Sequence, residues 1–360
     1  MPIDLNIRKI IKDNGYIPID EVMRQVLSDN GNSYYRNIKH IGSQGDFITA
    51  PEISQLFGEM VAVWLVTKWQ SIGSPLNFCL LELGPGQGTL MHDIIRTSQA
   101  IAPDMLKATN IYLYEINPYF VSLQKNHLQQ YGQINWIDNL DNLPNLPLIV
   151  IANEFFDAMP IKQYIKIGKY WQESVMIEDP VSSIIKYSNI GISNNLHTQF
   201  DLEHPHSTDC SILEESIESL RITRILSNKI NKNGGSMLII DYGYYITPEV
   251  RSSKQYISTL QAIKNHQYVP IIDYLGEADL SAHVDFYAIA KACSEYGHFT
   301  YNFNTQGNFL KNYGINIRAS ILKHQSNKKL HNIIDRQLER LTCSSLMGEL
   351  FKTLEVDKSM

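Results

Sequence analysis

Residues 78–90, FCLLELGPGQGTL, form the stretch of this chain that decides its fold. An apolar run ends at Glu82, glycines follow at every second position, and a helical pattern begins at Thr89. The glycines are Gly84, Gly86 and Gly88. Residues without a Cβ allow a tight turn whose backbone comes close to a ligand, and a helix beyond the turn offers unpaired N–H groups. The stretch therefore predicts a strand, a ligand-binding turn and a helix.

The spacing of this motif indicates which cofactor the turn would bind. It reads G-x-G-x-G with Glu82 two residues before the first glycine, and differs from the G-x-G-x-x-G of dinucleotide-binding folds. This variant suits a cofactor that lacks a pyrophosphate and lays an amino-acid tail on the loop. We expect S-adenosylmethionine, with a turn that binds nothing as the alternative.

Composition bounds the class of protein. At 360 residues the chain exceeds one average domain, and 44% apolar with 19% charged residues describes an ordinary globular protein. Lys and Arg number 31 against 37 Asp and Glu, and no basic block stands out, so nucleic acid is a poor candidate partner. The four scattered cysteines form no C-x-x-C pair, so we expect neither a metal site nor a disulfide framework.

The N-terminal segment, MPIDLNIRKIIKDNG (1–15), mixes charged residues with isolated apolar ones. It lacks the continuous apolar core of a signal peptide, and its early acids argue against a transit peptide. No apolar run approaches the roughly 20 residues that span a bilayer. From these features we expect a cytoplasmic protein that is not integral to a membrane.

Strand and helix patterns alternate along the chain and predict the α/β fold class. After the run that ends at Glu82, further strands are expected at 111–115, 134–137, 148–152, 236–244, 299–303 and 350–356. Helices are expected within 1–30, from residue 49 onward, and at 90–100, 118–128, 211–230, 285–296 and 308–345.

The segment before the first strand combines a loop with a helix start. Thr49 and Glu52 have the spacing of a capping box, with Pro51 in the first turn, and predict one long helix from this point. The preceding loop, residues 42–49, contains two glycines and Asp46. Thr49 is therefore a candidate cofactor-binding residue at a helix N-terminus that could face a ligand.

Two acids follow the second and third predicted strands. Glu115 ends the second strand, where nucleoside-binding α/β folds place a carboxylate that accepts hydrogen bonds from ribose hydroxyls. Asp138 follows the third strand, and its carboxylate could reach an adenine amino group. A surface turn is the alternative for Asp138.

A third set of polar side chains follows the continuous apolar run at 148–152. Asn153, Glu154 and Asp157 should stand beside the first two strands, because ligands of open α/β sheets lie beyond the carboxyl ends of the strands. The carboxylates of Glu154 and Asp157, which lie within four residues of each other, could orient a guanidinium or bind a cation. Helix capping by Asn153 or Asp157 is the alternative.

Residues 161–213 and 245–282 read as insertions, and the first alternates like a β-hairpin. Polar residues crowd a loop-to-helix junction at the end of the second insertion. They are Glu277, Asp279, His283 and Asp285. These side chains either line the mouth of the site or cap and solvate the junction, and the sequence leaves both interpretations open.

Six blocks of sequence closely resemble the MidA family of methyltransferases, in the order found there. They are GDFITAPEISQLFGE (45–59), LELGPGQGTLM (81–91), ANEFFDAMP (152–160), IIDYGY (239–244), GEADLSAHVDF (276–286) and TQGNFL (305–310). The family includes the mitochondrial complex I assembly factor with arginine methyltransferase activity. Six blocks are far more specific than a glycine motif alone.

The resemblance implies an S-adenosylmethionine-dependent methyltransferase with a Rossmann-like seven-stranded sheet. It implies a helical region at 1–72 that covers the cofactor site and a methyltransferase core at 73–360. The three glycines match the cofactor loop of the family, Glu115 matches its ribose-binding acid, and residues 45–54 match a block expected beside the cofactor. Many relatives have arginine at Gln87, whose side chain should point outward, so we expect little effect on binding.

The expected substrate is an arginine of a protein, with a core subunit of NADH:ubiquinone oxidoreductase as the partner that the resemblance implies; we also consider a homodimer. A protonated guanidinium is a poor nucleophile, since its pKa lies above about 12. We expect Glu154 and Asp157 to grip it and take up its proton, with His283 and Asp285 as further catalytic candidates. The alternatives are a small-molecule methyltransferase and a non-catalytic assembly factor, while the glycine spacing argues against a nicotinamide oxidoreductase.

Overall fold

The computed structural model describes residues 3–27 and 49–358 of the chain. The predicted loop at 42–48, including Asp46, therefore lies outside the described residues. Within the described part the chain forms two compact units. Unit 1 takes its residues from Met1–Ile38, Asp157–Arg221 and Tyr244–Tyr287, and unit 2 takes its residues from Lys39–Phe156, Ile222–Gly243 and Ala288–Met360. Both predicted insertions, 161–213 and 245–282, fall entirely in unit 1, and the predicted boundary at residue 72 stays a prediction.

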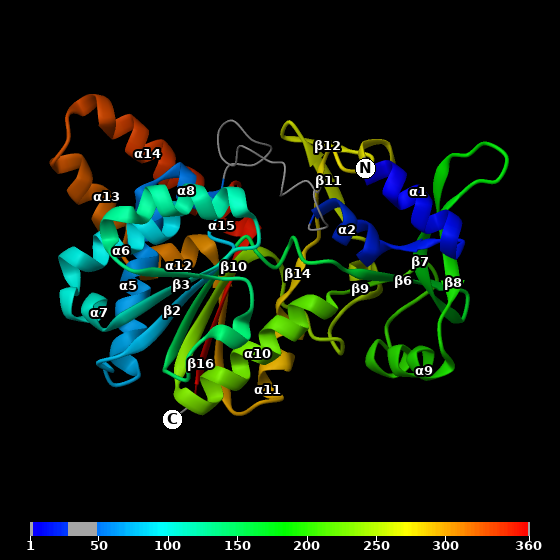
Figure 1. The fold of residues 1–360 in the computed structure, drawn as a ribbon, viewed down its shortest axis with the longest axis horizontal. Helices are drawn as coiled ribbons and strands as arrows, with labels where there is room; N and C mark the ends of the chain where they lie inside the picture. The colour runs from blue at the N-terminus through cyan, green and yellow to red at the C-terminus, as the bar shows by residue number, and fades with distance from the viewer. Residues whose placement is uncertain (1–2, 28–48, 359–360) are drawn as a thin grey trace. The chain divides into compact units, whose positions relative to one another are not determined.

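Unit 2 is built on a large mixed sheet (Figure 1). Its main strands are β2 (Phe78–Leu83), β3 (Thr109–Tyr114), β4 (Ile134–Ile137), β5 (Leu148–Asn153), β10 (Gly235–Tyr244), β15 (Phe299–Thr305) and β16 (Phe351–Lys358). They follow the order β15-β16-β10-β5-β2-β3-β4, and the sheet is eight-stranded with the two-residue strand β14 (Val284–Asp285). The strands from β10 to β4 run parallel, whereas β16 is antiparallel to both of its neighbours. The predicted α/β class is confirmed.

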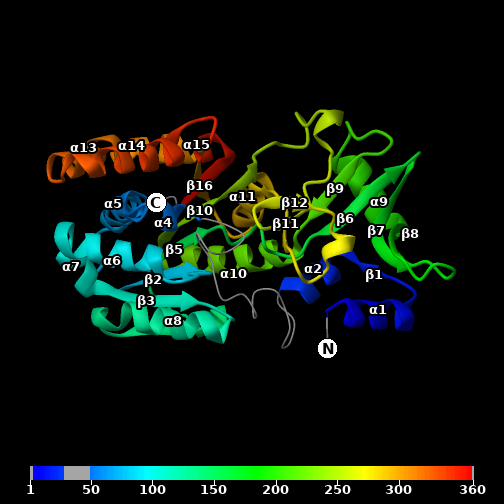
Figure 2. The ribbon, with the colours of Figure 1, turned by 90° about the horizontal axis from the view of Figure 1, so that it is seen from above.

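The helices that belong mainly to unit 2 pack around this sheet. They are α4 (Ala50–Ile53), α5 (Gln55–Ser71), α6 (Thr89–Ile101), α7 (Pro103–Ala108), α8 (Pro118–Leu128), α10 (Ile217–Asn233), α11 (Phe286–Ser294), α12 (Gln306–Asn312), α13 (Ile315–His324), α14 (Lys328–Thr342) and α15 (Met347–Leu350). Alternate residues of β2, β5 and β10 share one apolar core with α5 and α6. Helices α13 and α14 lie side by side next to α5 (Figure 2).

Unit 1 has its own sheets and its own core. Strands β1 (Ile17–Pro18), β6 (Lys162–Ile167), β7 (Tyr170–Glu178), β8 (Ile185–Gly191) and β9 (Ile212–Glu215) form an antiparallel sheet. Strands β11 (Gln261–Lys264), β12 (Gln267–Val269) and β13 (Asp279–Ser281) form a second sheet. Helices α1 (Ile3–Asn14), α2 (Ile19–Leu27) and α9 (Asn194–Glu203) complete the unit, and apolar residues of α1 and α2 pack with Met176 and Leu280.

One predicted helix start is wrong, and one predicted long helix is interrupted. The helix expected from residue 211 begins at Ile217, because residues 212–215 pair with β6 as strand β9. The helix expected from residue 49 is interrupted at Ser54, whose backbone is extended and whose Oγ accepts the N–H of Leu56 as the cap of α5. Thr49 makes no side-chain capping hydrogen bond, so the predicted capping box does not form.

Among the described residues, no helix combines the length and the apolar character needed to cross a bilayer.

Candidate active site

The strand order of the sheet changes direction at β2. Strand β2 pairs in parallel with β3 on one side and with β5 on the other. In open α/β sheets such a change in strand order opens a crevice beyond the strand ends, where ligands bind. The glycine loop starts at this point, so the fold places the most informative motif of the sequence at the expected crevice.

The glycine loop uses a backbone conformation that favours glycine. Gly84, Gly86 and Gly88 have φ angles of 59°, 53° and 84°. A Cβ on Gly84 would lie 2.8 Å from a ring carbon of Phe155, so the turn passes directly under that ring. The Nε2 atom of Gln124 in α8 donates to the carbonyl of Gly86 at 2.7 Å, which fixes the loop from the other side. The loop is therefore a preformed turn.

Two buried acids lie at the ends of β2 and β3. Glu82 is 2% exposed, and its Oε2 atom has no hydrogen-bond partner among the described residues. Burial raises the pKa of Glu82 to about 8, and the nearby charge of Glu115 adds to this rise. Burial also raises the pKa of Glu115 to about 7, against the lowering effect of hydrogen bonds from Asn117 and Gln124. A ligand that carries positive charge or donates hydrogen bonds would stabilise both ionised carboxylates.

A pocket of about 470 Å³ lies beside Glu115. Its lining brings the two predicted nucleoside-binding acids together, because Asp138 after β4 and Glu115 after β3 both face it. Val121 and Pro118 of α8 supply apolar surface, and Lys125 of the same helix also lines the pocket. A pocket with an apolar wall and two carboxylates could hold an adenosine moiety.

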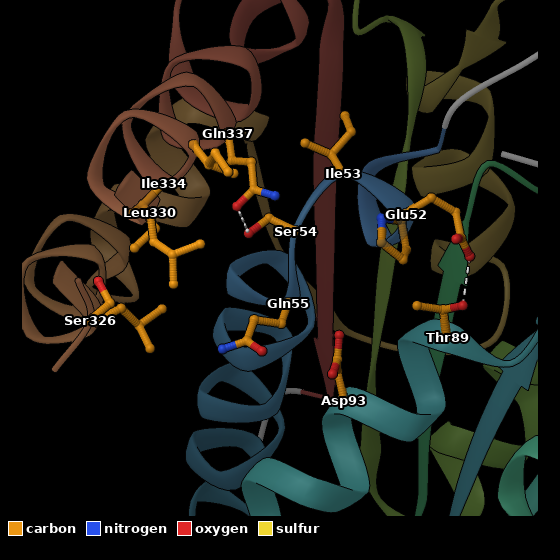
Figure 3. Close-up of a pocket in the computed structure, with 13 residues that line it drawn as sticks. Glu52, Ile53, Ser54, Gln55, Thr89, Asp93, Ser326, Leu330, Ile334 and Gln337 are labelled. Atoms are coloured by element: carbon orange, nitrogen blue, oxygen red, sulfur yellow. Dashed lines mark hydrogen bonds between the residues drawn. The ribbon is translucent and has the colours of Figure 1, made fainter. Parts of the chain in front are cut away.

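Helix α4 lies next to helix α6, which follows the glycine loop, and next to the end of β5. Glu52 accepts a hydrogen bond from the hydroxyl of Thr89, the first residue of α6, at 2.6 Å (Figure 3). The N–H of Ala50, which follows Thr49, donates to Oε1 of Glu154 at 3.2 Å. Thr49 is thus placed near the end of β5 through its neighbour, at the N-terminus of α4.

The residues drawn in Figure 3 line a second pocket, and a hydrogen bond from the hydroxyl of Ser54 to Gln337 of α14 is drawn there. The volume of this pocket is about 490 Å³, and the hydrogen bond is 3.0 Å long. Its lining includes Ile53, Leu330 and Ile334. Glu52 and Thr89 also line this pocket, so it adjoins helix α4, whereas none of the predicted site residues lines it.

Glu154 directly follows β5 and has a left-handed backbone. Its φ angle is 51°, which is uncommon for a residue with a side chain and costs on the order of 1–3 kcal/mol. Its N–H donates to the carbonyl of Ile240, and its carboxylate accepts hydrogen bonds from Ala50 and from the amide of Asn153. Side-chain and backbone contacts therefore fix the direction of this carboxylate at the end of the strand.

Asp241 is a residue of this site that the sequence analysis did not select. It is fully buried, its Oδ2 atom accepts the N–H groups of Phe155 and Phe156 at 3.2 and 3.1 Å, and its Oδ1 atom accepts the N–H of Tyr242. These bonds hold the turn that follows Glu154. The signal in the sequence was a lone acid at the end of the fifth strand, and its role requires knowing that β10 lies beside β5.

The other predicted catalytic residues belong to unit 1. Asp157 is buried, and its carbonyl accepts the N–H of Ala282 at 3.0 Å, so Asp157 and the segment with His283 lie together within that unit. The N–H of His283 donates to Thr259, and burial lowers the pKa of its imidazole. Asp285 lies near Tyr244, whose pKa is raised by burial and then by that carboxylate.

The remaining acids of this junction differ in environment. Glu277 forms an exposed ion pair with Lys264, whereas Asp279 is buried within β13. Glu277 is thus solvated, which agrees with the interpretation that these side chains cap and solvate the junction. Among the described residues, no group of three His, Cys, Asp or Glu side chains is placed to hold a metal ion.

Comparison with known protein families identifies the class of enzyme to which this chain belongs. A model of a family described as S-adenosyl-L-methionine-dependent methyltransferases matches residues 60–304. The chain belongs to this family. Its resemblance to MidA-like methyltransferases is confirmed, and S-adenosylmethionine is its methyl donor.

Curated relatives extend over nearly the whole chain. A Drosophila melanogaster protein named protein arginine methyltransferase NDUFAF7 homolog, mitochondrial, is 31% identical, with 97% of this chain and 83% of that protein covered. The protein arginine methyltransferase NDUFAF7, mitochondrial, of Xenopus laevis is 32% identical, with 88% and 75% covered. Both names place those proteins in mitochondria, so the expected cytoplasmic location of this methyltransferase fits its relatives poorly.

Solved structures support the fold. A protein from Burkholderia thailandensis bound to S-adenosyl-homocysteine is similar with a TM-score of 0.83 at 22% identity, and the similarity covers 99% of this chain and 92% of that one. A native crystal structure of a protein from the same organism gives a TM-score of 0.84 at 22% identity, with 99% and 91% covered. The methyltransferase thus has the fold of these proteins across both of its units.

Proposed function

We propose that the methyltransferase transfers a methyl group to an arginine side chain of a protein. The observation that carries this proposal is an identity of 31%, over 97% of this chain, to a protein named as a protein arginine methyltransferase. The carboxylate of Glu154, fixed at the end of β5, adds a group that can grip a guanidinium.

The residues at the ends of β2, β3 and β4 would hold the donor. The backbone of the glycine loop, Gly84 to Gly88, would receive its amino-acid tail, Glu115 its ribose hydroxyls and Asp138 its adenine, with Thr49 at the edge of the site. The unpartnered Oε2 atom of buried Glu82 supports this fit, because S-adenosylmethionine carries two positive groups that a carboxylate can attract. When bound, the donor supplies an activated methyl group on sulfur.

Glu154 and Asp157 are the proposed groups for the acceptor, with His283 and Asp285 as further candidates. A carboxylate that pairs with two nitrogens of a guanidinium leaves the third more electron-rich. When the third nitrogen accepts the methyl group, it loses a proton, and uptake of this proton by one of these side chains completes the transfer. Since burial keeps His283 mainly neutral near pH 7, its imidazole is a suitable second proton acceptor.

The variant Glu154→Gln tests the acceptor role. Glutamine keeps the oxygen that accepts from Ala50 but loses the charge, so we expect unchanged affinity for S-adenosylmethionine and a loss of turnover of about 100-fold or more. Radioactive methyl incorporation into protein, followed by hydrolysis and separation of methylarginines, measures turnover, and calorimetry measures affinity. Asp104→Asn, an exposed charge change on α7, is the control that should retain wild-type turnover. Full methylation by Glu154→Gln would remove Glu154 from the mechanism.

The same labelling separates the first alternative, a small-molecule methyltransferase. In that case the label would enter the low-molecular-weight fraction and no protein band would carry it. Labelled methylarginine in protein hydrolysate supports the proposal.

The proposed partner is a core subunit of NADH:ubiquinone oxidoreductase, and a homodimer is the proposed assembly. This partner rests on the resemblance of the sequence blocks to the MidA family. In cells that lack this protein, wild-type chain should restore the activity of that enzyme, whereas Gly86→Val, which cannot adopt the loop without strain, should not. Restoration by Gly86→Val would favour the second alternative, an assembly factor that acts without the donor.

A further inference from the structure

A separate polar pocket lies within unit 1. The loops 205–208 and 249–253 line a cavity of about 460 Å³. Its lining is rich in groups that can donate hydrogen bonds, namely His206, Ser207, Thr208, Arg251, Ser252 and Ser253. Among the described lining residues, Glu249 is the single acid, and the carbonyl of Glu249 lies 3.1 Å from Nε2 of His206. The pocket therefore presents donors far more than acceptors.

Arg251 gives this pocket a buried positive charge. Its side chain is almost entirely enclosed, with a residue exposure of 5%, and its guanidinium carbon lies 5.0 Å from the ring centre of Tyr244 and 4.5 Å from that of Tyr256. Nη2 donates to the hydroxyl of Tyr244 at 3.3 Å and to the carbonyl of Gln255 at 3.2 Å. Nε has no hydrogen-bond partner among the described residues, and none of these contacts is a carboxylate.

A buried guanidinium without an anion is costly. Removing such a charge from water is unfavourable, and contact with an aromatic face is a weaker interaction than an ion pair. The two tyrosines and the neutral acceptors therefore compensate for only part of the cost. The planar guanidinium is also the side chain best suited to binding phosphate and carboxylate oxygens.

We propose that this pocket binds a phosphate group, with Arg251 as its cation and with His206 and the lining hydroxyls as donors, except the hydroxyl of Ser252, which donates to Gln255. A tetrahedral phosphate offers more acceptor oxygens than a carboxylate and so matches a lining with several hydroxyl groups better. The residues of this pocket are distinct from those proposed for the methyl donor and the acceptor. The inference therefore stands apart from the proposed function.

Inorganic phosphate is the probe for this site, in the absence of methyl donor. Calorimetric titration of the full chain should show saturable binding with a Kd on the order of 1 mM. Arg251→Gln should weaken binding at least 10-fold, and Arg251→Lys should weaken it less, because it keeps the charge. Lys254→Gln, an exposed change of the same charge in the same loop, should bind like wild type. A thermal unfolding transition like that of wild type shows that each variant is folded, because the substituted residues lie in unit 1 and the proposed donor site lies in unit 2.

Several outcomes would overturn the proposal. They are no saturable phosphate binding by wild type, equal binding by Arg251→Gln, and an equal loss in Lys254→Gln. Acetate binding as tight as phosphate at the same ionic strength would overturn the preference for phosphate. If Arg251→Gln does not fold, His206→Gln on the exposed side of the pocket serves instead, with an expected several-fold loss.

Discussion

Two buried acids should make donor binding depend on pH. In the free protein the pKa of Glu115 is about 7 and that of Glu82 is about 8, both raised by burial. Binding favours the ionised carboxylates, so it releases protons, and the affinity for S-adenosylmethionine should rise as pH rises from about 6 to 8. Calorimetric titrations across this range measure the change.

Glu82→Gln is the control for this pH dependence. The amino group of the ligand itself titrates at about pH 8, and the loss of its proton lowers the affinity of both proteins, so the difference between their slopes reports on Glu82. The affinity of Glu82→Gln should rise less steeply with pH than that of wild type in the upper part of the pH range. Identical slopes would mean that the Glu82 carboxyl takes no part in binding.

Asp241 is predicted to act as a positioning residue. Asn at this place offers one oxygen and one N–H₂ group, so it cannot accept from Phe155, Phe156 and Tyr242 together. We expect Asp241→Asn to lower the free energy of unfolding by about 1–3 kcal/mol. Turnover should fall more than donor affinity, because the freed turn carries Glu154. Urea unfolding and steady-state kinetics test this, and a variant with wild-type stability and kcat would contradict it.

The acids at strand ends could be predicted from the sequence, because parallel strands place their carboxyl ends along one edge. Glu115 and Asp138 line one pocket for this reason. The role of Asp241 could not be predicted in this way. It depends on the pairing of β10 with β5, which joins residues more than 80 positions apart, as the bond from Phe155 to Asp241 shows.

At the scale of elements, the turn between β2 and α6 depends on glycine for two reasons. Gly84 has a φ of 59°, and a Cβ there would lie 2.8 Å from the ring of Phe155. Gly73 has a φ of 86° but open space around it, so Gly73→Ala measures the backbone term alone, about 1–2 kcal/mol. Gly84→Ala should cost more stability than this control and should also weaken donor binding. Equal costs in thermal unfolding would show that the ring simply moves aside.

Helix and strand boundaries show where local sequence stops being informative. Residues 212–215 fit a helical pattern, yet they form β9, because the edge of β6 offers them a partner. Ser54 interrupts the helix expected from Thr49, and its side chain caps α5 and reaches Gln337. In both cases a tertiary contact outweighs a weak local preference.

At the scale of the whole molecule, donor binding should protect one unit selectively. The residues proposed to hold S-adenosylmethionine lie in unit 2, while β6, β7 and β8 belong to the separate sheet of unit 1. Amide hydrogen exchange with and without donor should therefore show slower exchange in the segments 82–88 and 115–124, with β6 to β8 unchanged. Protection confined to unit 1 would contradict the proposed donor site.

The division into two units also explains the limits of the sequence analysis at this scale. Each unit gathers three separated segments of the chain, so no boundary along the sequence marks a single domain edge. The motifs of unit 2 could be recognised because they recur at strand ends. The antiparallel strands of unit 1 carry no glycine motif, although the block at 276–286 includes β13, and alternation within 161–213 predicted a hairpin, which β6 and β7 form.

The central claim is that Glu115, at the end of β3, holds the ribose of the methyl donor. Calorimetric titration of S-adenosylmethionine into wild type and into Glu115→Gln at about pH 8.5, where the carboxyl with its pKa of about 7 is ionised, tests it most directly. We predict binding about 10- to 100-fold weaker in the variant, the loss of one or two hydrogen bonds to a charged acceptor. Equal affinity of the two folded proteins would contradict the claim.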